Sequence, residues 1–377
     1  MKYCKKCIQP DTRPGIFFDE EGVCYACRYA ESIENIDWGE RQKKLKVIAK
    51  WAKENNNGGY DCVIGVSGGK DSTFQALYAR DNLGLNPLLV NAIPENITEI
   101  GKHNIENLAR LGFDLFMIRP DPNIMQQLIK RDFYKYCNPA KVTEYSLYAS
   151  AYQVALAYRI PLIIQGENAG LTLGVIEGLG TDDDSANVCF CNTLSGGDAI
   201  SEYGDEVDPK YLLQYQFPKK KLLDQARIRA IWLQYYVKEW SPRKNAEFAI
   251  AHGLKIRDDE DLHELGRYTQ YFSLDSDLHI CNQMLKYYKF GFGFATDEAC
   301  YDIREGYISR DEGINLVKEY DGRCGKKYIK DFCEYISITV DEFWRVVDVF
   351  VNKKLFEKDS KTGKWKPKFE VGVDYEE

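Results

Sequence analysis

The feature that most constrains the fold is a glycine-containing hexapeptide that directly follows a short apolar run. Residues 60–66 are rich in apolar and β-branched side chains, and they lead into the sequence SGGKDS at residues 67–72. Behind it, Phe74, Leu77 and Tyr78 recur at helical spacing. The order of strand, tight loop and helix is typical of the opening unit of a parallel α/β sheet.

The hexapeptide has the chemistry of an anion-binding loop. Gly68 and Gly69 let the backbone turn tightly and approach a phosphate, because they carry no Cβ. The new helix offers free N–H groups, and hydroxyl groups come from Ser67, Ser72 and Thr73. The G-x-x-x-x-G-K-[ST] spacing of kinases and GTPases is absent, so we predict that the loop holds a pyrophosphate group.

Three more strands are predicted after the loop, and helices separate them. The strand candidates are residues 87–92, 114–118 and 162–165, with helical patterns at 98–111 and 143–158. This alternation predicts an α/β fold with a doubly wound parallel sheet and right-handed crossovers.

Two stretches end predicted strands and therefore reach the carboxyl edge of the sheet, where nucleotides bind. Asn91 and Ala92 end the second strand, and we expect adenine contacts there. Gly166, Glu167 and Asn168 follow a later strand and bring a carboxylate and an amide toward the nucleotide or its acceptor, unless they form only a strand-ending turn. The candidate catalytic residues are Lys70, Asp71 and Glu167.

The first thirty residues hold two CxxC pairs that are separated by sixteen residues, with Cys4, Cys7, Cys24 and Cys27 as the four thiols. This spacing is typical of a zinc ribbon, in which four thiolates close a tetrahedron and leave no position open for chemistry. The segment has too few large apolar residues for its own core, so we predict a structural Zn²⁺. Four ordinary buried cysteines, or a redox-active CxxC, are the alternatives.

The chain is divided into three predicted parts. Residues 1–36 form the zinc-ribbon module, 37–205 the nucleotide-binding domain, and 206–377 a mainly helical domain for a substrate or partner. Its helical patterns lie at 224–240, 243–252 and 261–288, its capping boxes pair Ser309 with Glu312 and Thr339 with Glu342, and a polar, loose tail is expected after Lys353.

Charge and targeting signals narrow the function. A net charge of −8 and a pI near 5.3 give no broad basic field for a polyanion, which disfavours nucleic acid as a partner. The sequence has neither a secretory signal nor an apolar run of about eighteen residues that could cross a membrane. The twelve cysteines are therefore expected to be reduced or metal-bound, and the predicted location is cytoplasmic.

The SGGKDS loop resembles the SGGxDS motif of the N-type ATP-pyrophosphatases, the adenine-nucleotide alpha hydrolases. The resemblance implies a flavodoxin-like or HUP-type sheet, cleavage of ATP to AMP and pyrophosphate, and Mg²⁺ near the phosphates with a contribution from Asp71. Over most of its length the chain resembles the bacterial N-acetyl sugar amidotransferases. The matching stretches are CxxCIQPDTRPGIFFDEEGVCYAC, VIGVSGGKDST, QGEN and HICNQMLKYYKFGFGFATDEACYDIREGYISRDEGI.

This second resemblance implies an enzyme of surface-polysaccharide or flagellin-glycan synthesis, of the kind that makes acetamidino sugars for pseudaminic or legionaminic acids and O-antigens. ATP adenylates the acetamido oxygen of a nucleotide-linked or nonulosonic sugar, and ammonia then displaces AMP. Family members are thought to receive ammonia from a separate glutaminase subunit. The nearest match to a glutaminase G-x-C-x-G elbow here is GRCGK at 322–326, which lacks the second glycine in place, so we expect ammonia from a partner or from solution.

Two other functions stay open. A tRNA-thiolating enzyme of the same superfamily requires catalytic cysteines, and a non-catalytic nucleotide-binding partner protein requires none. The other candidate residues are Cys137, Cys189 and Cys191 for thiol chemistry, His279 as a base, and Lys219, Lys220, Lys221 and Arg304 as contacts for a diphosphate or a sugar carboxylate. The sequence identifies neither the sugar nor the oligomeric state.

Overall fold

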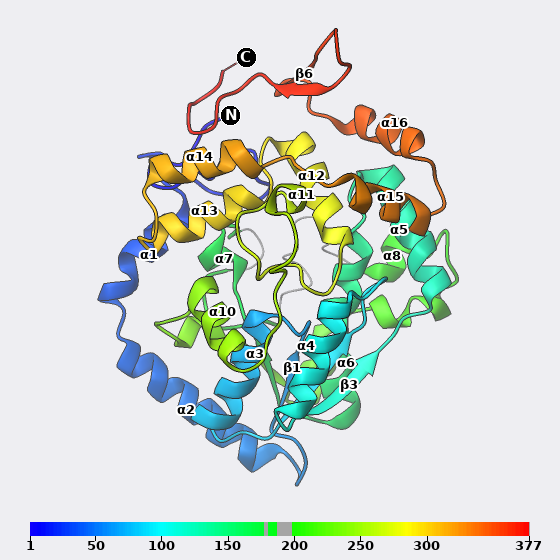
Figure 1. Cartoon of the computed structure of the whole chain (residues 1–377). Coiled ribbons are helices and arrows are strands. Elements are labelled where there is room, and N and C mark those ends of the chain that lie inside the picture. Colours follow the sequence, from blue (N-terminus) through cyan, green and yellow to red (C-terminus); the bar gives the residue numbers. More distant parts are fainter. Residues whose placement is uncertain (177–179, 187–197, 377) are drawn as a thin grey trace.

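The computed structural model of the chain describes residues 1–176, 180–186 and 198–376 (Figure 1). Its centre is a five-stranded parallel sheet in the order β3-β2-β1-β4-β5. The strands are β1 Cys62–Gly65, β2 Pro87–Ala92, β3 Asp114–Ile118, β4 Leu162–Gln165 and β5 Arg229–Trp232. The predicted doubly wound parallel sheet is confirmed, and its first four strands are those expected from the sequence.

The strand order fixes the place where a ligand can bind. The chain builds β2 and β3 on one side of β1 and then crosses to build β4 and β5 on the other side. The loops that follow β1 and β4 therefore diverge and leave a crevice at the carboxyl edge. A flavodoxin-like sheet has the order 2-1-3-4-5, so this order excludes that alternative and leaves the HUP-type one.

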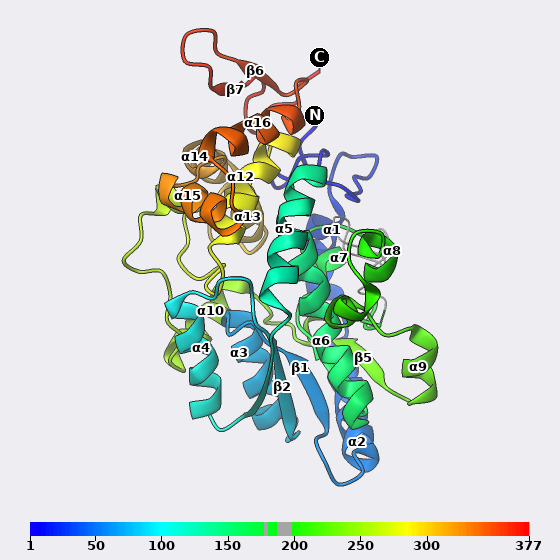
Figure 2. The ribbon, with the colours of Figure 1, turned by 90° about the vertical axis from the view of Figure 1, so that its right-hand side faces the viewer.

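Helices cover both faces of the sheet. Cys62 and Ile64 of β1 pack into a core with one set of helices, whereas Val63 between them packs into the core on the opposite face. Figure 2 shows α3 and α4 on one side of the strands and α6 on the other. Strand β1 carries no polar side chain after Asp61 because both of its faces are buried. The helices concerned are α2 Trp38–Asn55, α3 Lys70–Leu77, α4 Glu99–Arg110 and α6 Lys141–Tyr158.

The fifth strand corrects one expectation from the sequence. The pattern at 224–240 predicts a helix, but the segment holds the end of α9 Lys220–Gln225, then β5, then a short 3-10 helix. The apolar positions of β5 are buried against β4, whose register pairs Ile163 with Ala230. A four-residue apolar strand cannot be told from a helix segment by periodicity alone. The sheet thus runs to Trp232, while the division into domains stays a prediction.

The later part of the chain is helical, and Figure 1 shows the helices after residue 260 gathered over one end of the sheet, whereas α10 lies against α3. The predicted helix at 261–288 is broken, because Gly266 adopts a φ of +65° and a loop at 266–277 follows. The capping box of Ser309 and Glu312 is present, whereas the Thr339 side chain only accepts the Glu342 N–H. The helices are α10 Pro242–Ala251, α11 Leu262–Leu265, α12 Leu278–Phe290, α13 Phe294–Arg304, α14 Arg310–Tyr320, α15 Lys326–Tyr335 and α16 Val340–Phe350.

The C-terminal tail is not loose, so that prediction is wrong. Strands β6 Phe356–Lys358 and β7 Trp365–Pro367 pair as a hairpin, and Phe356 and Phe369 are buried in the helical core. The amino group of Met1 donates to the Tyr375 carbonyl at 2.6 Å, so the two termini meet, as Figure 2 shows. The remaining α-helices are α1 Tyr25–Ser32, α5 Pro122–Tyr136, α7 Ala169–Thr172 and α8 Ala199–Tyr203. In the described part of the chain, no helix is both long and apolar enough to span a bilayer.

Candidate nucleotide-binding and metal sites

The four N-terminal cysteines converge on one point. All four thiols are buried, and their sulfur atoms lie within 4.8 Å of one another. The Cys4 and Cys27 sulfurs are 3.8 Å apart, and those of Cys7 and Cys24 are 3.7 Å apart. Tetrahedral Zn²⁺ with Zn–S bonds of about 2.3 Å requires sulfur atoms about 3.8 Å apart. The donor set fits a structural zinc ion.

The cysteine module packs against the helices α10–α16 that follow the sheet, which we call the helical half, and not only against the sheet. Its buried cysteines share a core with Ala299 and Cys300 of α13 and Val317 of α14. The Arg310 side chain also donates from Nε to the Cys7 carbonyl at 3.0 Å. A metal held by these thiols therefore stabilises the position of α13 as well as the module itself.

The loop between β1 and α3 has the backbone shape expected of an anion cradle. Gly68 adopts a φ of +79°, and a Cβ there would lie 3.1 Å from the backbone nitrogen of Ile105 in α4. Gly69 caps α3, and its carbonyl accepts hydrogen bonds from the hydroxyls of Ser72 at 3.1 Å and Thr73 at 3.0 Å. The N–H groups of the first turn of α3 face the same crevice as this loop.

Lys70 and Asp71 are held by residues that lie far away in the sequence. Lys70 is buried and forms an ion pair with Asp71. Its Nζ lies 4.1 Å from the centre of the Phe272 ring, which belongs to the loop 266–277. Asn245 of α10 donates from Nδ2 to Asp71 Oδ1 at 2.8 Å. The helical half thus contacts the two charged residues of the loop directly.

Asn91 and Ala92 lie at the carboxyl end of β2, beside the loop. Asn91 donates from Nδ2 to the Val66 carbonyl at 2.7 Å, so it fixes the start of the loop. Its Oδ1 is buried and has no hydrogen-bond partner among the described residues. An orphaned acceptor at this edge fits a site that a polar ligand completes. Adenine contacts at Asn91 and Ala92 stay a prediction.

The residues after β4 face the loop from the other side of the crevice. A Cβ on Gly166 would collide with the Gln75 side chain, which explains the glycine. Tyr301 of α13 donates to Glu167 Oε1 at 2.8 Å. Burial raises the pKa of Glu167, and the negative charge of Asp71 raises it further. Asn168 is fully buried and caps α7 by accepting the Gly170 N–H at 2.8 Å, so its side chain positions the turn.

Of the other candidate residues that the structure describes, most do not contact the phosphate loop or Glu167. Cys137 is buried, and burial raises its pKa to about 12, whereas Cys189 and Cys191 lie outside the described residues. His279 of α12 lies near Glu95 and Asp275, and its charge opposes the effect of burial, which raises the pKa of both carboxyls. The side chains of Lys219, Lys220 and Lys221 are exposed, and Arg304 donates to the Thr172 carbonyl at 2.6 Å.

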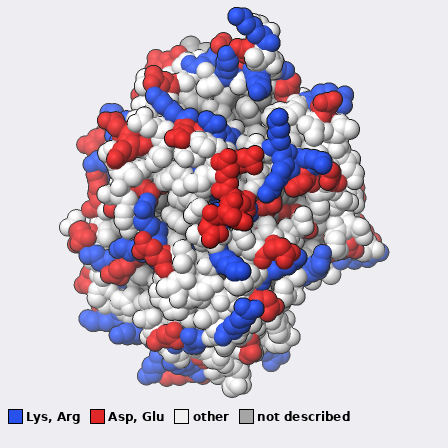
Figure 3. All heavy atoms as spheres, viewed as in Figure 1, with Lys and Arg blue, Asp and Glu red and all other residues white. Residues whose placement is uncertain are grey.

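Three residues of the site were not found from the sequence: Asn245, Phe272 and Tyr301. None of them lies in a local pattern that marks a ligand-binding residue. The only available signal was that Tyr301 falls within the long C-terminal stretch of family resemblance. On the face that Figure 3 shows, Lys and Arg side chains are interspersed with Asp and Glu, without a continuous basic surface.

Comparisons with known proteins match one part of this chain to a family from lipopolysaccharide biosynthesis. Residues 265–369 match the model of a family described as "LPS biosynthesis protein WbpG-like, C-terminal domain". No curated protein matches. Among solved structures, an NH3-dependent NAD synthetase from Campylobacter jejuni subsp. jejuni is 18% identical with a TM-score of 0.27, and the match covers 60% of this chain and all of that one. That likeness is too weak to carry an argument.

Proposed function

We propose that the protein is an ATP-dependent amidotransferase that converts the acetamido group of an N-acetylated sugar into an acetamidino group. The observation that carries the proposal is the pairing of an anion-binding loop at the end of β1 with a half-buried carboxylate, Glu167, at the end of β4. The match to a family model from lipopolysaccharide biosynthesis supports a sugar as the acceptor.

The reaction has two steps whose atoms balance. The acetamido oxygen attacks the α-phosphorus of ATP, so that an O–P bond forms and pyrophosphate leaves. Ammonia then attacks the carbon of the O-adenylyl imidate, and the C–O bond breaks to release AMP. An amide oxygen is a poor leaving group and AMP is a good one, which is why ATP is consumed.

Different residues of this chain act in these two reaction steps. The backbone at Gly68 and Gly69, with the hydroxyls of Ser67, Ser72 and Thr73, holds the pyrophosphate. Lys70 offsets the charge that develops on it. Asp71 is the residue that would hold Mg²⁺, and the ion would neutralise charge on the phosphates. Asn245 orients the Asp71 carboxylate through its hydrogen bond.

Glu167 is suited to move protons. Its raised pKa brings the carboxyl closer to neutral pH than that of an exposed glutamate, so it can accept a proton from the ammonia adduct. Tyr301 orients it by donating to Oε1. Zn²⁺ on the four thiols has no role in this chemistry, because four ligands leave no open position.

Ammonia is proposed to come from a separate glutaminase subunit. In the GRCGK segment, Cys324 lies between α14 and α15, with its sulfur 3.7 Å from that of Cys281 and 3.7 Å from the Gly325 carbonyl. This environment is not the histidine-activated elbow of a glutaminase. For the tRNA-thiolating alternative, the raised pKa of Cys137 makes that thiol a poor nucleophile at neutral pH.

A mass-spectrometric screen tests the proposal. Free and nucleotide-linked N-acetyl sugars are incubated with the protein, ATP, Mg²⁺ and ammonium, with the Asp71→Asn variant as control. We expect one sugar to lose about 1 Da, as an oxygen atom is replaced by an NH group, with AMP formed in equal amount. Thiolation of added tRNA with no change in any sugar would contradict it.

A further inference from the structure

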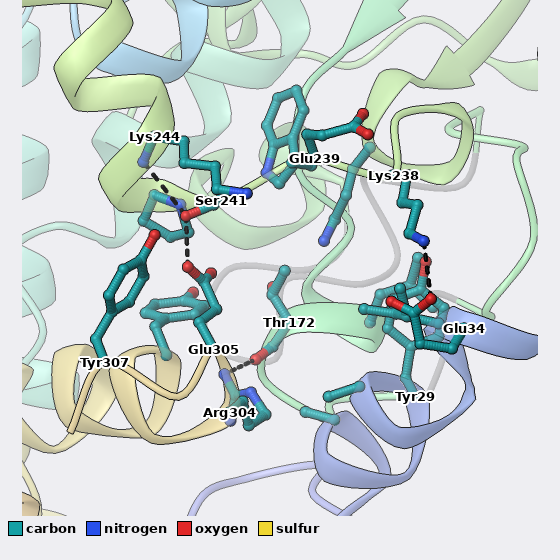
Figure 4. Close-up of a pocket in the computed structure, with 18 residues that line it drawn as sticks. Tyr29, Glu34, Thr172, Lys238, Glu239, Ser241, Lys244, Arg304, Glu305 and Tyr307 are labelled. Carbon is teal, nitrogen blue, oxygen red and sulfur yellow. Dashed lines mark hydrogen bonds and ion pairs between the residues drawn. The ribbon is translucent and has the colours of Figure 1, made fainter. Parts of the chain in front are cut away.

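A pocket of mixed polar and apolar lining lies beside the candidate site, and the proposed mechanism does not use it. Its volume is about 430 Å³, which is in the range of small-ligand sites. Figure 4 shows its walls, which come from α1, from α7, from the segment 234–244 and from α13. The pocket is thus assembled by the cysteine module, the sheet domain and the helical half together.

The sheet topology places this pocket on the acceptor side of the nucleotide. The phosphate loop follows β1, and Asn91 ends β2, so the nucleotide elements lie over one half of the sheet. The pocket is lined by Leu171 and Thr172 after β4 and by Gln234 after β5, which are the strands on the other side of β1. A substrate in the pocket therefore approaches the crevice from the side opposite to adenine.

Three contacts join the pocket wall to the candidate site: one reaches Glu167, one its neighbour Asn168, and one the phosphate-loop helix α3. Tyr301 lines the pocket and donates to Glu167 at 2.8 Å. Gln234 lines it too, and its Oε1 accepts the Asn168 N–H at 2.9 Å. The Trp240 ring packs edge-on against Phe74 of α3, with the ring centres 5.6 Å apart. Glu167 and the phosphate-loop helix thus lie directly behind the pocket wall.

The charges of the lining favour a ligand without a large net charge. Lys238 pairs with Glu34 at 2.9 Å, Arg304 donates to the Thr172 carbonyl, and Ser241 donates to Glu305, as Figure 4 shows. The lining has three carboxylates and three cationic side chains in all: Glu34, Glu239 and Glu305 against Lys238, Lys244 and Arg304. Since these charges cancel, the pocket has no excess of cations for a triphosphate.

The rest of the lining suits a sugar ring. Tyr29 and Trp240 offer aromatic faces for the C–H groups of a sugar, and Tyr301 and Tyr307 offer the faces that Arg304 and Arg243 do not cover. Among the described residues, no hydrogen bond is made by the Trp240 indole N–H, the Tyr307 hydroxyl or the Lys244 ammonium group, so these donors are free for hydroxyl groups. We propose that this pocket holds the ring of the N-acetylated sugar, with its acetamido group directed toward Glu167 and Tyr301.

This inference deepens the proposed function and rests on it for the choice of sugar. Its test uses the full chain labelled with 5-fluorotryptophan, in which the ¹⁹F signal of Trp240 is assigned by a Trp240→Phe variant. The probes are N-acetylglucosamine, N-acetylgalactosamine and N-acetylmannosamine, free and as UDP derivatives. We expect a sugar to shift the Trp240 signal and to leave the other five tryptophan signals in place.

Two variants make the test specific. Tyr307→Ala removes an aromatic wall that is 41% exposed, and we expect about tenfold weaker binding of that sugar. Tyr211→Ala, at a tyrosine that is 47% exposed and lies outside the pocket, is the matched control and should leave binding unchanged. Equal affinity in both variants, or sugar binding that leaves the Trp240 signal in place, overturns the pocket assignment.

The pocket and the proposed function fail in different ways. If a sugar is converted to its acetamidine while the Trp240 signal does not move, the function stands and the pocket assignment falls. If a sugar shifts Trp240 and Tyr307→Ala weakens its binding, but no acetamidine forms, the pocket assignment stands and the function falls. With neither binding nor conversion, both fall.

Discussion

The candidate site has a floor and a cover that are built in different ways. The floor, residues 67–73 with Asn91, is held by backbone geometry and by hydrogen bonds to neighbouring backbone carbonyls. The cover, Asn245, Phe272 and Tyr301, reaches Asp71, Lys70 and Glu167 through side chains from separate segments. The floor is complete once the sheet forms, whereas the cover exists only when the helical half is packed against it.

Because of this difference, we expect nucleotide binding and catalytic turnover to depend on different residues. Under the proposed function, backbone N–H groups of the floor hold the pyrophosphate, whereas the side chains of the cover contact Asp71 and Glu167. Damage to the cover should therefore reduce turnover more than nucleotide affinity. The four predictions below test this division, from the largest expected effect to the smallest.

Loss of the metal should damage the cover and spare the floor. Cys24→Ser removes one of four ligands, and metal binding in zinc-ribbon peptides is worth on the order of 10 kcal/mol. Because the cysteine module shares a core with α13, we expect loss of bound zinc, faster amide exchange in α13 and slow exchange in β1 and β2. Metal analysis and hydrogen exchange measure both. Cys324→Ser, at a cysteine outside the cluster, is the control, and uniformly faster exchange would argue against the division.

Within the floor, Asp71→Asn should abolish most of the activity. The substitution keeps the size of the side chain and the contact with Asn245 but removes the negative charge. We expect AMP formation to fall by about a thousandfold, or about 4 kcal/mol, in a chain that still folds but melts at a lower temperature, because the buried Lys70 loses its ion-pair partner. Asp81→Asn, on the exposed turn after α3, serves as the control. Activity near that of the parent chain would exclude Asp71 from the mechanism.

The stability of the helical half should depend on pH through Asp321. Burial raises the pKa of this carboxyl from 3.8 to about 6. Between these pH values the folded state binds more protons than the unfolded state, so stability falls as pH rises from about 4 to about 6. At about 1.4 kcal/mol per pKa unit, the loss is about 3 kcal/mol.

Urea unfolding across that pH range measures the effect of Asp321. Asp321→Asn cannot titrate, so its free energy of unfolding should fall less steeply than that of the parent chain between pH 4 and pH 6. Parallel pH profiles for the two proteins would show that Asp321 is not the titrating group.

The smallest expected effect comes from Tyr301→Phe. The variant keeps the ring and removes the hydrogen bond to Glu167, which stabilises the charged carboxylate, so the pKa of Glu167 should rise. We expect about tenfold lower turnover at pH 7, a pH–rate profile displaced to higher pH, and an unchanged KM for ATP. Tyr211→Phe is the matched surface control. A raised KM for ATP with normal turnover would place Tyr301 with the floor instead.

The sequence predicts the floor because its signals are local. Four strands, α4, α6, the loop and the four cysteines all follow from periodicity, glycines and spacing over a few residues. The cover was missed because Asn245 and Phe272 meet the loop across more than 170 residues of chain. The sequence pattern also missed β5, because its four residues are recognisable as a strand only through their pairing with β4, which lies far away in the sequence.

The tail was misjudged for a related reason. Residues after 353 are mostly polar, but Phe356 and Phe369 insert into the helical core from either side of a short hairpin. Buried Leu355 and the hydrogen bond from Arg310 to the Gly372 carbonyl also hold the tail, and average composition reveals none of these contacts.

The central claim is that ATP activates the acetamido oxygen, and an oxygen label tests it most directly. The sugar carries ¹⁸O in its acetamido carbonyl and is incubated with the protein, ATP, Mg²⁺ and ammonium, and the AMP is examined by mass spectrometry. The account predicts that the ¹⁸O appears in the phosphate of AMP, in equal amount to the acetamidine. Unlabelled AMP alongside the acetamidine would contradict it.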